Sequence, residues 1–462
     1  MLRPESAPAL TGKAADVAAL ARHWASQRLP GLSSHLGITA CGAVREVVGM
    51  DVVASLPMAR LGMLCSITRS DGSEPLLAEV VGFGAGRVRM TAMGTLQAIG
   101  AGNLVKVVAP EHLIVGHSEL VGDVVDAYGR SMMGRKGAFV CDPETPGARA
   151  VLRGEVSPLS RKPIDEAVHT GVRAIDGLMT LGKGQRIGIF AGPGTGKTTL
   201  LSAIARNAKV DVVVFALIGE RGRELKEFVE SMMESETARR MVVVAASSDR
   251  SSLERARAAF TATAIAESFR EQGDNVLLLM DSLTRYARAQ REIGAAAGEP
   301  GGRGGFSPSF YSSLPRLIER TGNFHKGSIT AIYTVLAEQD LEADPVADEA
   351  RSLLDGHIVL ARKLGEAGHF PAIDVLRSLS RTMPSTTDQS HRDAARKVRA
   401  LMARYEALEF LIRVGEYMAG RVAEDDRAVE GNTRITSYLR QDLDRDCTPY
   451  TAAISALQAL AA

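Results

Sequence analysis

The chain is poor in cysteine, poor in aromatic residues and without an excess of charge of either sign. Of its 462 residues, four are cysteines, and 5% are Phe, Trp or Tyr. Cys41, Cys65, Cys141 and Cys447 are far apart in the sequence and form no Cys-x-x-Cys pair. This spacing argues against a structural zinc site and against a disulfide framework, so we interpret the four as reduced thiols.

Charge and hydropathy exclude further classes. The chain has 55 Lys and Arg against 54 Asp and Glu, so the net charge of +1 gives no electrostatic signature of a nucleic-acid or anionic-membrane binder. The longest uncharged stretches, 91–105 and 448–462, contain Gly, Ser, Thr or Gln and are shorter than the roughly 20 apolar residues that span a bilayer. The first residues lack the basic and apolar segments of a secretory signal. We therefore expect a cytoplasmic chain with no transmembrane helix.

What is present is typical of a packed globular protein, with 45% hydrophobic residues and a mean hydropathy of 0.00. The sequence pattern changes along the chain and predicts four parts. These are an N-terminal helical segment (1–36, around Trp24), a small β-barrel (37–110), an α/β domain with a parallel sheet (111–385) and a C-terminal helical domain (386–462).

Alternating strands and helices indicate the parallel sheet. Apolar, β-branched runs predict its strands, and apolar residues at helical spacing, as at Leu253, Ala256 and Phe260, predict the helices between them. The predicted strands are 186–190, 210–218, 241–246, 276–280 and 329–335.

A glycine-rich loop with a lysine follows the strand at 186–190. Gly192, Gly194 and Gly196 allow backbone N–H groups to turn toward phosphates, and a helix that begins at Lys197 adds its positive end and a point charge. Thr198 would place its hydroxyl on magnesium. The loop departs from the strict pattern at Ala191, where that pattern has glycine. The predicted nucleotide-binding residues here are Gly192, Pro193, Gly194, Thr195, Gly196, Lys197, Thr198 and Thr199.

Two carboxylates end other predicted strands. Asp281 follows 276–280, and after a phosphate-binding loop it is the expected group that holds magnesium through water. Glu220 follows 210–218, at the sheet edge where open α/β sheets bind ligands, and a carboxylate there can orient and deprotonate water. The alternative for Glu220 is a helix-capping residue paired with Arg221 or Arg223.

Arg381, at the end of the segment 371–381, is a candidate arginine finger. Such a guanidinium, offered to the γ-phosphate held by a neighbouring subunit, stabilises the charge of the transition state. The alternative is an ordinary surface arginine.

Taken together, these motifs resemble the rotary ATP synthase superfamily. Within it, the chain is most similar to the ATPases of bacterial type III protein export, in their injectisome and flagellar branches. The motifs that carry the resemblance are 170–176, 184–191, 219–224, 281–285 and 371–381, with further likeness at 220–228, 286–294 and 350–358.

The resemblance implies a RecA-like P-loop core and a homohexamer that hydrolyses Mg-ATP. It implies that the enzyme energises type III secretion by releasing chaperones from substrates and unfolding them. It supports Lys197, Glu220 and Arg381 as catalytic residues, adds Arg221 to the nucleotide-binding set, and makes Phe370 the aromatic that packs against adenine. For Phe370 the alternative is a core aromatic.

The implied partners are chaperone–substrate complexes, stator or stalk proteins, and the export gate at the cytoplasmic face of the inner membrane. No specific nucleic acid is expected, because Phe83 is the one aromatic in 37–110 and an RNA translocase needs an aromatic binding platform. A flagellar export ATPase and a nucleotide-binding subunit of a rotary ATPase remain as alternatives. The family's usual proline after Pro300 is replaced here by the glycine-rich run 301–305, which predicts a more flexible loop.

Overall fold

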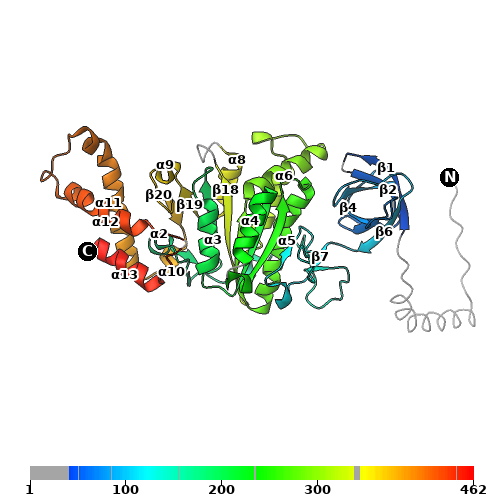
Figure 1. Ribbon diagram of the computed structural model, residues 1–462, viewed down its shortest axis with the longest axis horizontal. Coiled ribbons are helices and arrows are strands. Elements are labelled where there is room, and N and C mark those ends of the chain that lie inside the picture. Colours follow the sequence, from blue (N-terminus) through cyan, green and yellow to red (C-terminus); the bar gives the residue numbers. More distant parts are fainter. Residues whose placement is uncertain are drawn as a thin grey trace, which may run out of the picture. The chain divides into compact units, whose positions relative to one another are not determined.

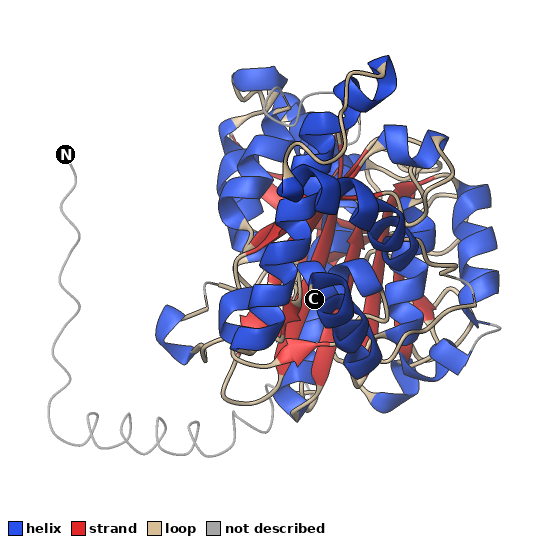
Figure 2. Cartoon of the chain, turned by 90° about the vertical axis from the view of Figure 1, so that its left-hand side faces the viewer, coloured by secondary structure: helices blue, strands red, loops and turns tan. Residues whose placement is uncertain are grey.

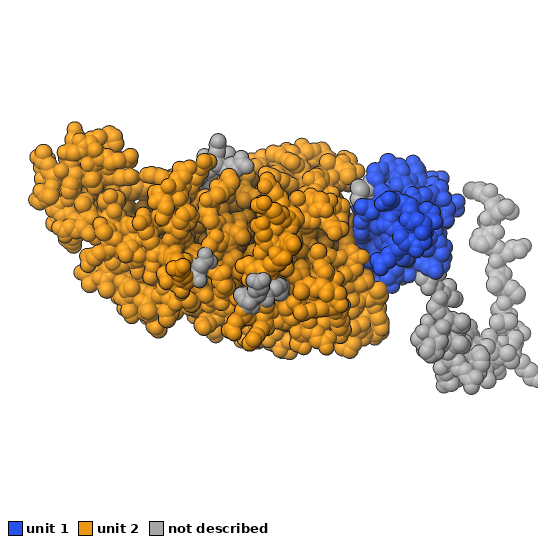
Figure 3. Space-filling model, in the orientation of Figure 1, with its two compact units in different colours: residues 1–110 blue, residues 111–462 orange. Residues whose placement is uncertain are grey.

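The computed structural model describes residues 41–462 apart from 50, 85, 155, 234–235, 338–343 and 444. The chain divides into two compact units, residues 1–110 and residues 111–462, which Figure 3 colours separately. The predicted helix around Trp24 lies outside the described residues. Within the described part, none of the helices has the length and apolar character that a membrane span requires.

The first unit contains a closed barrel, which confirms the predicted barrel. Its strands alternate between buried and exposed residues, as expected where one face of a strand packs inward. At the turn over residues 70–73, the Ser73 N–H donates to Asp71 Oδ1 (3.0 Å). Around the barrel the strand order is β1 (Cys41–Val48), β2 (Asp51–Ser55), β5 (Arg87–Ala92), β4 (Leu76–Gly84), β3 (Leu64–Ile67) and β6 (Leu104–Ala109).

The second unit is built on a largely parallel sheet with helices on both faces, as Figures 1 and 2 show. Each strand predicted from the sequence falls within or next to an observed one. The order across the sheet is β20 (Ile373–Ser380), β19 (Gly356–Leu360), β13 (Arg186–Ala191), β18 (Ser328–Leu336), β16 (Asn275–Asp281), β14 (Val212–Glu220), β15 (Met241–Ser247) and β8 (Val124–Val125), with β17 (Gly322–Asn323) beside β18.

Two small sheets and several short helices complete this unit. The short strands are β7 (Leu113–Ile114), β9 (Phe139–Val140), β10 (Arg149–Ala150), β11 (Ala167–Val168) and β12 (Leu181–Gly182). The 3₁₀ helices are η1 (Ser118–Leu120), η2 (Pro158–Ser160), η3 (Glu236–Arg240) and η4 (Arg303–Gly305). Short α-helices are α2 (Arg173–Leu178), α8 (Pro345–Leu353), α9 (Arg362–Glu366) and α10 (Met383–Thr386).

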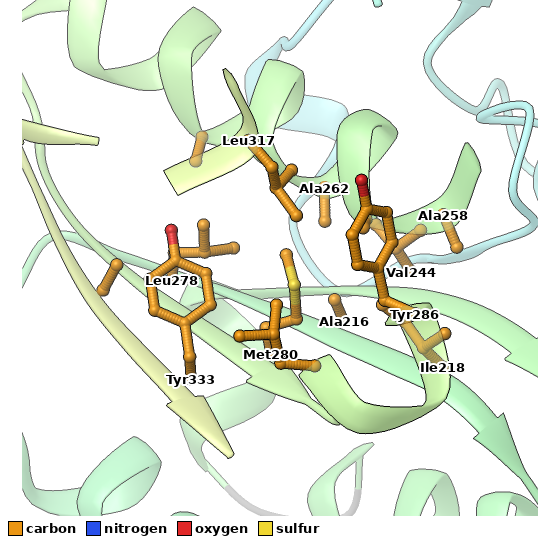
Figure 4. Packing of buried hydrophobic residues seen from close by; sticks show 14 of the residues in the cluster. Ala216, Ile218, Val244, Ala258, Ala262, Leu278, Met280, Tyr286, Leu317 and Tyr333 are labelled. Carbon is orange, nitrogen blue, oxygen red and sulfur yellow. The ribbon is translucent and has the colours of Figure 1, made fainter. Parts of the chain in front are cut away.

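Two apolar cores cover the faces of the main sheet. On one face, side chains of β14, β16 and β18 pack against α5 (Ser252–Gln272), α6 (Leu283–Ala296) and α7 (Pro308–Ile318). Figure 4 shows Met280 and Tyr333 from the strands turned toward Ala262 and Leu317 from the helices. On the other face, alternate residues of β13, β14 and β15 pack against α3 (Lys197–Asn207) and α4 (Gly222–Met233). Burial of both faces explains why these strands are nearly continuous apolar runs.

The chain after β20 is helical, as predicted. It forms α11 (Gln389–Val414), α12 (Ala423–Leu439) and α13 (Tyr450–Ala461). The first turn of α12 contains the acidic residues Glu424, Asp425 and Asp426, which favour a helix N-terminus. These helices bury Val398, Ile435 and Leu457 in the same apolar cluster as α3 and β13.

A buried ion pair joins two parts of the second unit. Arg320, 3% exposed, binds the carboxylate of Glu267 in α5 with two donors (2.9 and 2.8 Å). Its third donor bonds the carbonyl of Val151, beside β10 (2.6 Å). Because Glu267 is fully buried, its charge depends on the arginine.

Arg320→Met is therefore expected to lower the free energy of unfolding by about 3 kcal/mol, since it leaves a buried carboxylate with Arg149 as its remaining cationic neighbour (3.4 Å). Urea unfolding followed by circular dichroism measures the change. The exposed Arg316, one turn earlier, provides the control, and Arg316→Met is expected to change the value by less than about 0.5 kcal/mol. Equal effects of the two substitutions would contradict this role for the pair.

Candidate nucleotide-binding site

The glycine-rich loop joins β13 to α3, as its sequence predicts. Gly194 and Gly196 have positive φ angles (75° and 79°), a conformation that side-chain-bearing residues rarely adopt. Gly196 is the residue before the first turn of α3, so the free N–H groups of that turn lie at the loop. Thr195 is buried and donates to the Gly192 carbonyl (2.9 Å), which closes the turn. The result is a cradle of backbone donors at a helix N-terminus, the form that binds phosphate.

Lys197 and Asp281 meet although they are distant in sequence. The ammonium Nζ of Lys197 lies 2.5 Å from Asp281 Oδ1. The buried hydroxyl of Thr334 in β18 donates to the same oxygen (2.8 Å). Because β18 lies between β13 and β16 in the sheet, its Thr334 hydroxyl lies near the ends of both neighbouring strands.

Glu220 ends β14 next to the strand that ends in Asp281. Its side chain is 14% exposed, and its Oε2 lies 3.1 Å from Nη2 of Arg285, in the first turn of α6. Burial raises the pKa of Glu220 above its usual value, and the negative charge of Asp281 raises it further, while the charges of Arg285 and Lys197 act against this shift. A carboxyl with a raised pKa at a sheet edge is suited to taking a proton.

The alternative prediction for Glu220, a pair with Arg221 or Arg223, is not what the structure shows. Arg221 contacts Glu224 (3.4 Å), and Arg223 contacts Glu227 (3.3 Å), both along α4. The partner of Glu220 is Arg285, which also donates to the carbonyl of Gly219. Arg285 is the last residue of the motif 281–285, and nothing in the sequence around it indicates a contact with Glu220.

Phe370 stands beside the phosphate-binding loop. A Cβ added to Gly196 would lie 3.5 Å from Cδ1 and Cε1 of its ring. The ring is also 44% exposed, so Phe370 is not a core residue. An open aromatic face next to the loop is a surface on which a nucleotide base can stack.

Arg381 lies at the opposite end of the strands from the phosphate-binding loop, near the beginning of β13. Strand β20 runs antiparallel to β19, pairing Ile373 with Leu360 and Ser380 with Gly356. Its last residues therefore reach the beginning of β13, where the Arg381 N–H donates to the carbonyl of Asp355 (3.0 Å). The loop follows the far end of β13, five residues away at about 3.3 Å each. An arginine side chain cannot cover that distance to its own chain's phosphate site.

The oxygen atoms near the phosphate-binding loop are of the chemical types that coordinate magnesium. Thr198 is exposed in the first turn of α3, and the carboxylate of Asp281 lies beside Lys197. Hydroxyl and carboxylate oxygens are the ligands that Mg²⁺ prefers, and such sites use few protein ligands together with phosphate and water. The residues present thus fit the ion that accompanies a nucleotide.

The strand–loop–helix cradle, the lysine–aspartate pair and the glutamate on the neighbouring strand define a P-loop nucleotide-binding protein. Comparisons with known proteins agree. Residues 171–380 match the ATP synthase alpha/beta family, nucleotide-binding domain. Residues 387–459 match the T3SS EscN ATPase C-terminal domain.

Comparisons with individual relatives identify the family within this class of nucleotide-binding proteins. The type 3 secretion system ATPase of Pseudomonas syringae pv. syringae is 50% identical over 91% of this chain and 94% of its own length. The flagellum-specific ATP synthase of Bacillus subtilis is 43% identical over 87% and 91% of the two chains. The solved structure of assembled EscN from enteropathogenic E. coli superposes with a TM-score of 0.83 at 44% identity, over 91% of this chain and all of the other. The chain belongs to the type 3 secretion system ATPase family.

Gly219→Ala tests the geometry around Glu220. Gly219 has a φ of 69°, and an added Cβ would lie 2.9 Å from Cδ of Arg285. We expect the substitution to destabilise the protein by about 1–2 kcal/mol and to displace Arg285, with loss of ATPase activity. Thermal unfolding and steady-state activity measure the two effects.

Gly222→Ala is the matched control, because this glycine begins α4 and an added Cβ would meet open space. It is expected to leave both quantities nearly unchanged. Full activity of Gly219→Ala would show that Arg285 need not hold its place.

Proposed function

We propose that this chain is a Mg-ATP hydrolysing subunit of a homohexamer that energises type III protein secretion. The observation that carries the proposal is the separation of the site's parts. The carboxyl ends of the parallel strands bring together Lys197, Asp281 and Glu220. Arg381 lies at the opposite end of the strands, near the beginning of β13. A finger at that position can serve only the site of a neighbouring copy, so a complete site requires a ring.

Each residue then has a chemical role. The loop from Gly192 to Thr199 and the lysine bind the β- and γ-phosphates, and Phe370 stacks on the adenine. Thr198 and, through water, Asp281 would hold Mg²⁺, which when bound neutralises phosphate charge. Glu220 accepts the proton of the attacking water, and Arg285 fixes the orientation of that carboxylate. Arg221 completes the nucleotide-binding set.

The role in secretion rests on the relatives. EscN has been solved in complex with its central stalk EscO, at the same TM-score of 0.83. By analogy, we propose that the ring binds a stalk protein at the cytoplasmic face of the inner membrane, next to the export gate, and there releases chaperones from substrates and unfolds them. The flagellar branch is the second candidate, and the higher identity to the secretion ATPases (50% against 43%) favours the first.

A mixing experiment tests the shared site. Glu220→Gln is expected to bind ATP without hydrolysing it, and Arg381→Ala is expected to behave in the same way, whereas Lys197→Ala loses binding. When Glu220→Gln and Arg381→Ala chains are mixed in equal amounts, about one site in four has an intact glutamate and an intact neighbouring arginine, so activity should reappear. Steady-state phosphate release measures it.

Mixing Glu220→Gln with Lys197→Ala is the matched control, because both defects lie in the same half of the site. In that mixture the Lys197→Ala chain has the glutamate but no bound nucleotide, so no site is complete. If the first mixture also stays inactive while forming mixed rings, the arginine does not act between subunits.

The pH dependence of turnover tests Glu220 as the base. Because only the deprotonated carboxylate accepts a proton, the raised pKa of Glu220 in the nucleotide-free chain places the acidic limb of kcat/KM above the 4.5 of an ordinary glutamate. Arg285→Gln removes a charge that lowers this pKa, so the limb should move to higher pH. Arg288→Gln, at an exposed position on the same helix, should leave it in place. A limb that moves to lower pH in Arg285→Gln would overturn the assignment.

A further inference from the structure

The segment between α12 and α13, described at residues 440–443 and 445–449, is hydrogen-bonded to Phe370 and to the last turn of α3. We call this segment the C-terminal linker. At the base end, the N–H of Gln441 donates to the carbonyl of Phe370 (2.9 Å). Farther along the linker, Arg206 donates to the carbonyl of Leu443 (3.1 Å); this arginine lies in the last turn of α3, at the end of the helix away from the phosphate-binding loop.

Gln441 is the centre of these contacts. Its side chain is 4% exposed, and its amide is fully engaged. Oε1 accepts from the Arg173 N–H (2.9 Å), and Nε2 donates to the carbonyls of Gly171 (2.7 Å) and Asp446 (2.8 Å). A buried amide that satisfies both its donor and its acceptor sites holds its own backbone in one place.

Packing fixes Phe370 only in part, so the hydrogen bond from Gln441 contributes to its position. The ring is 44% exposed beside Gly196, so packing covers only part of it. The residue before it, His369, is buried close to Arg440: burial lowers the pKa of His369, and the charge of Arg440 lowers it further. Arg440 thus lies near His369, and Gln441 bonds to Phe370, the next residue along the chain.

From this geometry we propose that Gln441 is a positioning residue for ATP, acting through the backbone of Phe370. Its side chain anchors the linker to the turn at 171–173, and its N–H donates to the Phe370 carbonyl. This bond fixes the position of the Phe370 ring relative to the phosphate-binding loop. This inference rests on the proposed function, in which Phe370 stacks on adenine. The residue lies about 70 positions beyond Phe370 in a helical part of the chain, outside every nucleotide-binding motif of the sequence.

Gln441→Glu tests the proposal with almost no change of shape. The new carboxylate has no donor for the carbonyls of Gly171 and Asp446 and repels both, so the linker loses its anchor. We expect KM for ATP to rise about fivefold, with kcat changed less. Inhibition by inorganic tripolyphosphate, which has no base to stack, is expected to keep its Ki.

Tyr438→Phe is the matched control. It removes hydroxyl bonds to the carbonyls of Arg173 and Ala453 at the same junction, and those bonds do not involve Phe370. It should lower the melting temperature without changing the ratio of KM for ATP to Ki for tripolyphosphate. If Gln441→Glu merely lowers the melting temperature in the same way, its role is structural and the proposal is wrong.

Phe370→Ala distinguishes a failure of the proposed role of Phe370 from a failure of the proposed role of Gln441. If it leaves the same ratio unchanged, the base does not stack on Phe370, and the proposed role of that aromatic fails. If Phe370→Ala raises the ratio and Gln441→Glu does not, the aromatic assignment stands and the role of Gln441 is overturned. Should Gln441→Glu fail to fold, Gln441→Asn, which shortens the side chain by one methylene, replaces it with the same expected change.

Discussion

The parallel direction of β13, β14 and β16 is the constraint on which the site depends. Parallel strands end at a common edge, so a loop lysine, an aspartate and a glutamate from three separate stretches of chain meet there. The contact between Lys197 and Asp281, 84 residues apart, is the clearest product of that constraint. Helices on both faces bury the strands and leave this edge for ligands.

The same sheet also separates Arg381 from the other candidate site residues of its own chain. Its edge strand β20 runs against the others and takes Arg381 to the beginning of β13, away from the phosphates. In the proposed function, this single antiparallel strand places Arg381 where it would serve the site of a neighbouring copy. The C-terminal linker makes its contacts within one chain, since Gln441 bonds to Phe370 and Leu443 bonds to Arg206 at the end of α3.

Much of this could be predicted from sequence because the information is local. Apolar runs of β-branched residues gave the central strands, and the residue that follows each run, Glu220 or Asp281, could be placed at the ligand edge by topology alone. The strands β19 and β20 were missed: β19 has a run of only three aliphatic residues, and β20, at the edge of the sheet, alternates between buried and more exposed positions and contains Asp374 and Arg377.

The partners of the site residues could not be predicted, because they are set by tertiary packing. Glu220 lies next to Arg221 in sequence, yet it pairs with Arg285, which the positive φ of Gly219 allows to approach. Thr334 and Gln441 carry no sequence signal for their roles, since a buried threonine in a strand and a glutamine after a helix are common. Their contacts with Asp281 and with Phe370 exist only in the folded chain.

The central claim is that the ATPase site is completed between copies of this chain. The most direct test is steady-state Mg-ATPase activity per subunit over a range of protein concentrations, with the mass of the particles measured in the same samples. The account predicts that activity per subunit rises as rings form, and that Arg381→Ala forms rings without gaining activity. Activity that is independent of concentration and already present in the monomer would contradict it.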